Sequence, residues 1–191
     1  MLFSGLLSLL VAGAALAQYT PPGFVPAVDT ELVVKFGSKT ITPGQSLGKA
    51  DTGRMPILGT NDTALPGTYL FIFIDIDLPA SFSNTGARGV VLHGMITGFK
   101  SSTMLKDGIY QLSTTATGPS SYFAPAPPAE RPAWPHNYIQ LLFLQPDGFK
   151  VPSNHQAAVN SRLNFNITAF MKDANLDAPV RANYFRQVNG A

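Results

Sequence analysis

The longest apolar run of the chain spans residues 69–78 and reads "YLFIFIDIDL". A continuous run of this kind, entered from the Pro-Gly turn at residues 66–67, is typical of a strand buried on both faces. Other segments alternate apolar and polar positions or are bounded by glycine and proline, which favours shorter strands. Further strands, or strand-and-turn segments, are predicted at residues 31–37, 41–47, 50–59, 90–99, 138–149 and 178–188.

One segment has the pattern of a helix, and two segments are too rich in proline for regular structure. Residues 166–176 place Asn166 at a capping position and repeat apolar side chains at helical spacing. Residues 18–30 and 121–137 carry prolines throughout. We therefore expect a mainly β fold with one late helix, in a single domain over residues 31–191 that follows a Pro-rich arm.

The composition suits one globular domain and excludes several classes of function. Of the 191 residues, 45% are hydrophobic and 13% charged, which permits a sizeable core. The formal net charge is +2 without a basic cluster, so nothing favours nucleic-acid binding. The absence of cysteine excludes thiol catalysis, and no phosphate-loop, zinc-protease or nucleophile-elbow motif occurs. We expect no cofactor.

The first 17 residues have the pattern of a secretion signal. They are apolar and end in small residues, so we expect cleavage after Ala17, a secreted protein and no transmembrane segment. Two acceptor motifs for N-glycosylation occur, at Asn61 and Asn166. Asn61 is the better candidate, because a capping role at Asn166 is expected to bury the amide nitrogen to which a glycan is attached.

Titratable residues accompany the most apolar strands at three places. Asp75 and Asp77 close the first long strand, His93 lies in the second, and His136 precedes the third. The two aspartates are two positions apart, so their side chains are expected on the same side of the strand. Such a pair is costly in an apolar setting unless a cation or a donor faces it. The histidines are the available partners, with the Tyr138 hydroxyl as a further donor.

Each of these residues also has a structural interpretation. Either aspartate alone could pair with an arginine, with Arg88, Arg131 and Arg181 as candidates, and a lone His93 is more often a core residue than a functional one. Two histidines and two aspartates could also bind zinc; we rank this below an anion site and expect no metal. His155, in a polar stretch, is expected at the surface.

Four segments together resemble the phosphatidylethanolamine-binding protein family. "DIDLP" resembles the family's D-P-D-x-P motif, and "VLHGMITGF" resembles the strand that carries a pocket histidine. "APAPPAERPAWPHNYIQLLFLQP" resembles its G-P-P…H-R-Y segment, and "FNITAFMKDANLDAPVRANYFR" resembles its closing segment. The matches occur in order and span roughly residues 30–188.

This resemblance implies a fold and a site. The fold is a β-sandwich of antiparallel strands with Greek-key-type connections and one or two short helices, with an anion pocket at one end. A histidine beside carboxylates favours its protonated form, which suits a small anionic or lipid-like ligand. The residues implied for the pocket are Asp75, Asp77, Pro79, His93, Tyr122, Ala126, Pro127, His136 and Tyr138.

The pocket is expected to depart from the family pattern. Ala124 and Ala126 stand where the family has glycines, which hinders close approach of a ligand to the backbone. Gly94 stands where a bulky aromatic is common, and we expect it to widen the pocket. Asn137 replaces a basic residue. The bond between Leu78 and Pro79 is a candidate for the cis form, although most bonds before proline are trans.

Three functions are compatible with this pattern. The first is a secreted protein that binds a small anionic or lipid-like molecule. The second, implied by fungal relatives of the family, is an accessory or catalytic protein of a natural-product pathway that couples anhydride-bearing polyketide units of the maleidride type. There, His93 and Asp75 are the candidates for a general base. The third is inhibition of a serine protease or carboxypeptidase through the Pro-rich arm. The partners then include pathway enzymes or a protease, and whether the protein is an enzyme stays open.

Overall fold

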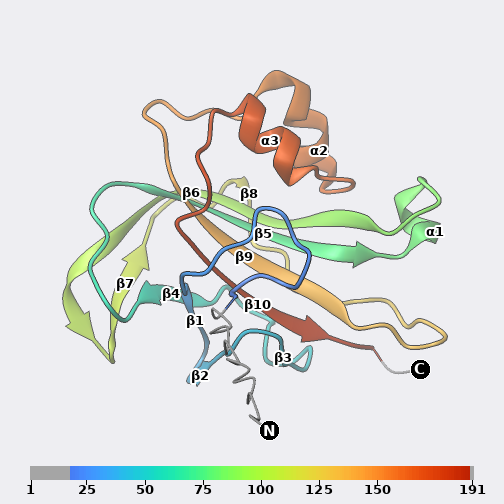
Figure 1. Ribbon diagram of the computed structural model, residues 1–191, viewed down its shortest axis with the longest axis horizontal. Helices are drawn as coiled ribbons and strands as arrows, with labels where there is room; N and C mark the ends of the chain where they lie inside the picture. Colours follow the sequence, from blue (N-terminus) through green and yellow to red (C-terminus); the bar gives the residue numbers. More distant parts are fainter. Residues whose placement is uncertain (1–17, 190–191) are drawn as a thin grey trace, which may run out of the picture.

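The computed structural model describes residues 18–189, so the predicted signal peptide lies outside the described residues (Figure 1). The strands form one curled sheet in the order β2-β1-β4-β7-β6-β5-β9-β10-β3, and β8 pairs with β6 beside this path. The mainly β fold predicted from the sequence is confirmed; β3 pairs with β10 in parallel, and the other strand pairings of the described chain are antiparallel. The strands are β1 (Val33–Phe36), β2 (Lys39–Thr40), β3 (Gln45–Ser46), β4 (Ile57–Thr60), β5 (Tyr69–Leu78), β6 (Gly89–Lys106), β7 (Ile109–Ser113), β8 (Pro119–Ser120), β9 (His136–Leu144) and β10 (Arg181–Gln187).

The central strand β5 is buried on both faces, as its continuous apolar run predicts. Successive side chains of a strand alternate between its faces. Leu70, Ile72 and Ile74 belong to one apolar core, while Phe71 and Phe73 belong to the other. All five are completely buried, and each contributes roughly 1.5–3 kcal/mol to stability relative to an exposed side chain.

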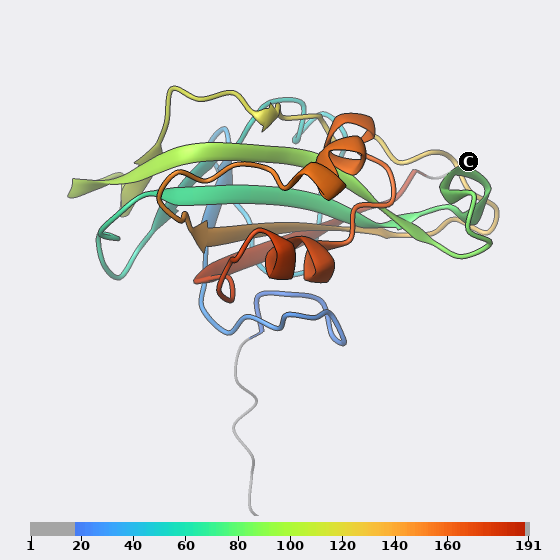
Figure 2. The same cartoon turned by 90° about the horizontal axis from the view of Figure 1, so that it is seen from above.

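Short helices cover one side of the sheet. Figures 1 and 2 show α2 and α3 together over the long strands, with α1 at the end of the sheet between β5 and β6. The predicted helix is confirmed, because the Asn166 side chain accepts a hydrogen bond from the backbone nitrogen of Ala169 at 3.0 Å. The others are too short to give a helical repeat in the sequence. The helices are α1 (Ala80–Ser83), the 3₁₀-helix η1 (Ser153–His155), α2 (Gln156–Ser161) and α3 (Ile167–Asp173).

His155 lies in the interior, so the predicted surface position is wrong. Only 8% of this residue is exposed, and its ring packs edge-on against Phe170 with 5.3 Å between centroids. Its Nε2 atom lies 2.7 Å from a carboxylate oxygen of Asp173. The polar sequence around it concealed this burial, because η1 and α2 fold that stretch back onto α3.

The Pro-rich arm packs against the helix-covered core. Thr20 and Val28 are buried, and the backbone nitrogen of Tyr19 donates to the carbonyl of Val28 at 2.8 Å. Phe24 also packs on this core. No helix within residues 18–189 is long and apolar enough to cross a membrane.

The bond between Leu78 and Pro79 is trans, so the cis form for which it was a candidate is not adopted. The cis bonds of the described chain precede Pro26, Pro119 and Pro132. Pro79 has the extended backbone angles φ −55° and ψ 145° and stands directly before α1, where a trans bond lets the chain leave β5 and begin the helix.

Candidate active site

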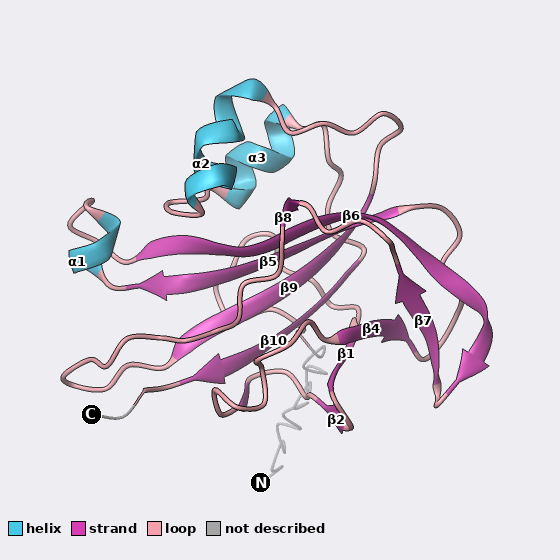
Figure 3. Ribbon diagram, turned by 180° about the vertical axis from the view of Figure 1, so that it is seen from behind, coloured by secondary structure: helices cyan, strands magenta, loops and turns pink. Residues whose placement is uncertain are grey.

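Three strands bring their ends together on one side of the molecule. Because β5 runs antiparallel to both β6 and β9, its end lies beside the start of each. Asp75 is paired with Val91 on β6 and with Tyr138 on β9. The loop of residues 121–135, which joins β8 to β9, passes this end of the sheet (Figure 3). The sheet thus assembles three segments that are far apart in the sequence.

His93 occupies a β-bulge in β6. Phe73 on β5 is paired with Gly94, and the next residue, Ile74, is paired with Leu92, which leaves His93 without a partner. In a regular strand, neighbouring residues point to opposite faces, so His93 would point away from the face of Phe73. The bulge instead redirects the ring, which lies 5.4 Å from the Phe73 ring between centroids.

Asp75 and His136 form a buried pair. The Nδ1 atom of His136 lies 2.7 Å from Oδ2 of Asp75, and the two residues are 1% and 3% exposed. The other oxygen of Asp75 accepts the backbone N–H of Asp77 at 2.8 Å. Burial lowers the pKa of His136, but the hydrogen bond and negative charge of Asp75, together with Glu130, outweigh it and raise the pKa above its usual value. The carboxylates around His136 therefore favour its cationic form.

Glu130 meets the second nitrogen of His136. Its Oε1 atom lies 2.9 Å from Nε2, so the imidazolium donates to a carboxylate on each side. Arg88 donates to both oxygens of Glu130, at 2.6 and 3.3 Å. The hydrogen bond from Arg88 lowers the pKa of Glu130, and that from His136 adds to it against the effect of burial.

Asp77 holds the end of the Pro-rich loop. One carboxylate oxygen accepts the indole N–H of Trp134 at 3.0 Å, and the other accepts the backbone and side-chain N–H groups of Asn137, both at 2.9 Å. The guanidinium of Arg88 lies over the Trp134 ring, 4.4 Å from its centroid, and donates to the backbone oxygen of Asp77 at 2.6 Å. The two aspartates therefore have different roles. Asp75 stabilises the protonated form of His136, and Asp77 holds the loop in place through Trp134 and Asn137.

His93 is held as a neutral imidazole. Its pKa is lowered, first because the ring is buried; the hydrogen bond to the backbone oxygen of Phe123 and the charge of Asp75 oppose this shift without overcoming it. Nδ1 lies 2.8 Å from that oxygen. A carbonyl only accepts, so Nδ1 carries the proton and Nε2 carries a lone pair.

Two tyrosines belong to the surroundings of the histidines. The Tyr138 ring packs against both, with its centroid 5.2 Å from that of His93 and 6.3 Å from that of His136. Burial, then the negative charge of Asp75, raises the pKa of the Tyr138 hydroxyl, which stays neutral. Tyr122 stacks on Phe73 at 5.8 Å and donates its hydroxyl hydrogen to the backbone of Thr52 at 2.7 Å, so that hydroxyl is engaged in the fold. We call Asp75, His93, His136 and Tyr138 the histidine cluster.

The sequence matches the model of the phosphatidylethanolamine-binding protein family over residues 33–185. The chain belongs to this family. Two fungal relatives carry the name "Phomoidride biosynthesis cluster protein N". The one from Talaromyces stipitatus is 28% identical, over 97% of each chain. The one from a fungal species is 33% identical, over 63% of this chain and 52% of the relative.

Solved structures of the phosphatidylethanolamine-binding protein family share this fold. A carboxypeptidase Y inhibitor in complex with its cognate proteinase aligns with a TM-score of 0.60 and 19% identity, over 84% of each chain. The phosphatidylethanolamine-binding protein of Plasmodium vivax aligns with a TM-score of 0.58 and 16% identity, over 87% of this chain and 91% of that one. At this level of identity the similarity shows the fold alone, so inhibition of a protease stays a prediction.

The fold brings only part of the family-derived pocket into contact. The histidine cluster is assembled as described, with Asp77 and Pro79 at the end of β5. Ala126 is exposed, whereas Pro127 is buried and its backbone oxygen accepts from the Asn189 side chain at 3.1 Å. Their role in binding stays a prediction, as does that of the whole pocket.

The space beside Gly94 is already occupied. A Cβ atom at this position would lie 3.8 Å from both Cβ of Phe73 and Cα of Tyr122, in ordinary contact. The segment that carries Tyr122 therefore fills the side on which we expected a wider pocket.

Glu130 was not identified from the sequence as a site residue, and Arg88 was identified as an ion-pair residue without its correct partner. Arg88 was one of three candidate partners for an aspartate, but its side chain pairs with Glu130. Arg181 pairs with Asp62 at 2.9 Å, at the other end of β10. Glu130 is the only acidic residue in residues 121–137, and this was the one indication in the sequence. The neighbouring residues do not show that its side chain contacts His136. Within residues 18–189, no three histidine or acidic side chains are arranged to hold a metal ion.

The two glycosylation motifs differ in the surroundings of their amide nitrogens. Asn166 is exposed and caps α3 through its oxygen, so capping does not bury the amide nitrogen as we expected. The nitrogen of Asn61 donates to Glu31 at 3.4 Å. The reason for preferring Asn61 is therefore wrong, while glycosylation at either position stays a prediction.

Proposed function

We propose that this protein acts in a fungal natural-product pathway, where the histidine cluster performs acid–base chemistry on a pathway intermediate. The observation that carries the proposal is a pair of buried histidines packed against the Tyr138 ring, one hydrogen-bonded to a carbonyl and the other to two carboxylates, so that their pKa values shift in opposite directions. A neutral imidazole beside a cationic one is suited to removing a proton while charge develops nearby. The near full-length similarity to a phomoidride cluster protein supports the pathway context.

His93 is the base in this proposal. The carbonyl of Phe123 fixes the tautomer, so the lone pair of Nε2 is available to accept a proton. Asp75 lies close enough to oppose the loss of basicity caused by burial. It also holds His136, which packs against the Tyr138 ring and supplies the positive charge of the site.

The substrate class is an anhydride-bearing polyketide unit with an acidic C–H group next to the ring. The proton passes from that carbon to Nε2 of His93, and the electron pair of the broken C–H bond is delocalised into an anhydride carbonyl as an enolate. The enolate carbon then adds to the C=C bond of a second unit, whose π electrons move into its own anhydride carbonyl. The enolate formed there takes the proton back from the imidazolium of His93. Holding both units in one site supplies the orientation that the coupling requires.

Substrate entry requires the loop of residues 121–135 to move. His93 and His136 are 3% and 1% exposed. Phe123 stacks on the His93 ring at 5.2 Å, and Glu130 covers His136. Both come from this loop. Displacement of the segment around Phe123 uncovers His93, the base, and does not require Glu130 to leave His136.

A deuterium-exchange experiment tests the proposed chemistry. The purified protein is incubated in D₂O with 2,3-dimethylmaleic anhydride, and loss of the methyl proton signal is followed by NMR. We expect exchange above the buffer rate with the wild type, and a rate at least about 100-fold lower with His93→Gln, because the base is removed.

His155→Gln is the matched control. His155 is another buried histidine with a carboxylate partner, but it lies in the helical layer outside the histidine cluster. Its exchange rate should equal that of the wild type, with circular dichroism confirming that both variants fold. Exchange at the buffer rate in the wild type, or undiminished exchange in His93→Gln, contradicts the proposal.

We also propose that the chain is secreted, on the pattern of residues 1–17. Secretion requires that a fungal host release the mature chain, beginning at Gln18, into the medium. N-terminal sequencing of the released protein measures this directly, and retention of the intact chain in the cell contradicts it.

A further inference from the structure

Glu130 lies beside the histidine cluster, at the position from which a bound anion would contact His136. Nδ1 of His136 is taken by Asp75, so Nε2 is its remaining donor. Glu130 meets that donor at 2.9 Å, and Arg88 holds the same carboxylate at 2.6 Å. The Glu130 side chain is only 17% exposed, and that of His136 is 1% exposed. The chain itself thus provides the anion that an imidazolium attracts.

An external anion meets two obstacles here. It must break the bonds that Glu130 makes to both cations, and these form without loss of translational freedom because Glu130 belongs to the same chain. It must also enter a site that already contains three carboxylates, those of Asp75, Asp77 and Glu130. Arg88 and His136 are hydrogen-bonded within this group, and a third cation, Arg162, lies over the Phe123 ring beside His93. A neutral molecule meets neither electrostatic penalty.

We propose that Glu130 is a specificity-determining residue that excludes free phosphate and carboxylate anions from the histidine cluster and reserves it for neutral substrates. Resting on the proposed function, this defines its substrate more closely. An anhydride ring is neutral, whereas its hydrolysis product is a dicarboxylate. Glu130 therefore distinguishes the reactive anhydride from the spent diacid, which would otherwise compete for the same site.

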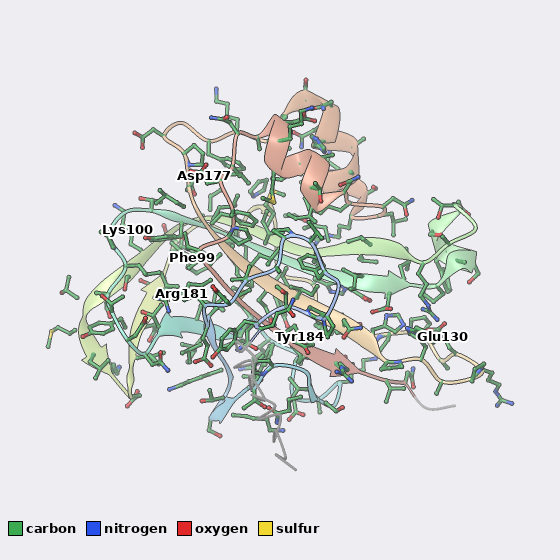
Figure 4. The ribbon with its side chains drawn as sticks, viewed as in Figure 1. Phe99, Lys100, Glu130, Asp177, Arg181 and Tyr184 are labelled. Atoms are coloured by element: carbon green, nitrogen blue, oxygen red, sulfur yellow. The ribbon has the colours of Figure 1, made fainter. Side chains whose placement is uncertain are left out.

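Figure 4 shows why the chain offers a control for this inference. Glu130 lies at one end of the long strands, and Arg181 lies towards the other. Glu31 is close to Arg181, whose guanidinium donates to its backbone oxygen at 3.2 Å. Removing the charge of Glu31 therefore changes the net charge by the same amount as removing that of Glu130, but far from the histidine cluster.

Isothermal titration calorimetry with inorganic phosphate and with maleate tests the inference on the full chain. We expect Glu130→Ala to bind both anions at least tenfold more tightly than the wild type. Glu130→Gln should be intermediate, because its amide oxygen still accepts from His136. Glu31→Gln should match the wild type. Circular dichroism confirms folding, and Glu130→Asp, which keeps the charge but shortens the reach, provides a second variant if the alanine protein does not fold.

Equal affinity of the wild type and the Glu130 variants overturns the inference. It is overturned also if no variant binds either anion, because Glu130 is then not what excludes them. These measurements do not depend on turnover. A wild type without deuterium exchange but with the expected order of anion affinities contradicts the proposed chemistry alone, and the reverse result contradicts the role of Glu130 alone.

Discussion

His93 and His136 both pack against the Tyr138 ring, yet their surroundings shift their pKa values in opposite directions. Burial dominates at His93, which has a carbonyl as its hydrogen-bond partner. At His136 the two carboxylates outweigh burial. Burial therefore favours the neutral form of one histidine and the carboxylates favour the cationic form of the other, and this difference follows from the identity of the neighbours.

The raised pKa of His136 makes stability depend on pH. Folding favours its protonated form, so its contribution is complete below the unfolded pKa of about 6.5 and is lost as pH rises through the folded value. We expect the free energy of unfolding, measured in urea, to fall as the pH rises above about 6.5 and through the folded pKa. His93, whose pKa is lowered, is neutral in both states over most of this range and contributes little to the slope.

His136→Asn provides the comparison. This variant retains a hydrogen-bonding side chain but cannot take up a proton, so its profile should be flatter than that of the wild type over the same range. A flat wild-type profile, or an equal slope in the variant, would show that the carboxylates do not raise the pKa of His136.

At the scale of elements, the register of β5 against β6 decides which side chains reach the site. In a regular strand the His93 side chain would point to the face opposite Phe73. The bulge places it on the same face as Phe73. A second irregularity, between the pairs of Asp75 and Leu78, lies where Asp77 turns towards the loop. The alternation of side chains along a strand predicts that Asp75 and Asp77 point to the same face. Their hydrogen-bond partners differ because the pairing of β5 with β6 becomes irregular after Asp75.

Two glycines in strands of the sheet are expected to respond differently to alanine. A Cβ at Gly94 meets nothing closer than 3.8 Å, so Gly94→Ala should change the free energy of unfolding by less than about 0.5 kcal/mol. At Gly59 the added atom would lie 2.9 Å from the backbone oxygen of Tyr110 and from Cδ1 of Ile109. Gly59→Ala should therefore cost about 1–3 kcal/mol. Urea unfolding measures both, and a reversed order would contradict the packing around β4 and β6.

At the scale of the whole molecule, the Pro-rich arm belongs to the folded unit although the sequence predicts a boundary at residue 30. Its buried residues complete the core beneath α2 and α3. Val28→Ala should lower the free energy of unfolding by about 1–3 kcal/mol, because Val28 is 6% exposed. Val25→Ala is the matched control, since Val25 is 67% exposed and should change stability by less than about 0.5 kcal/mol. Two equally small effects in urea unfolding would mean that the arm is not packed on the core.

The sequence by itself determined the features that depend on local pattern. The continuous apolar run of β5 shows a strand with two buried faces, the cap at Asn166 shows the start of α3, and four ordered motifs show the family. The meeting of aspartates and histidines at strand ends was also predictable, because antiparallel neighbours place those ends together.

Only the tertiary structure determined which side chains of the site contact one another. The bulge at His93 depends on its pairing with β5, and the different partners of Asp75 and Asp77 depend on where the loop of residues 121–135 returns. Glu130 reaches His136 because Arg88, 42 positions earlier in the chain, holds its carboxylate. The burial and the charge of a site depend on side chains contributed by segments that are distant in the sequence. The periodicity of one segment predicts its own secondary structure but not its contacts with the others.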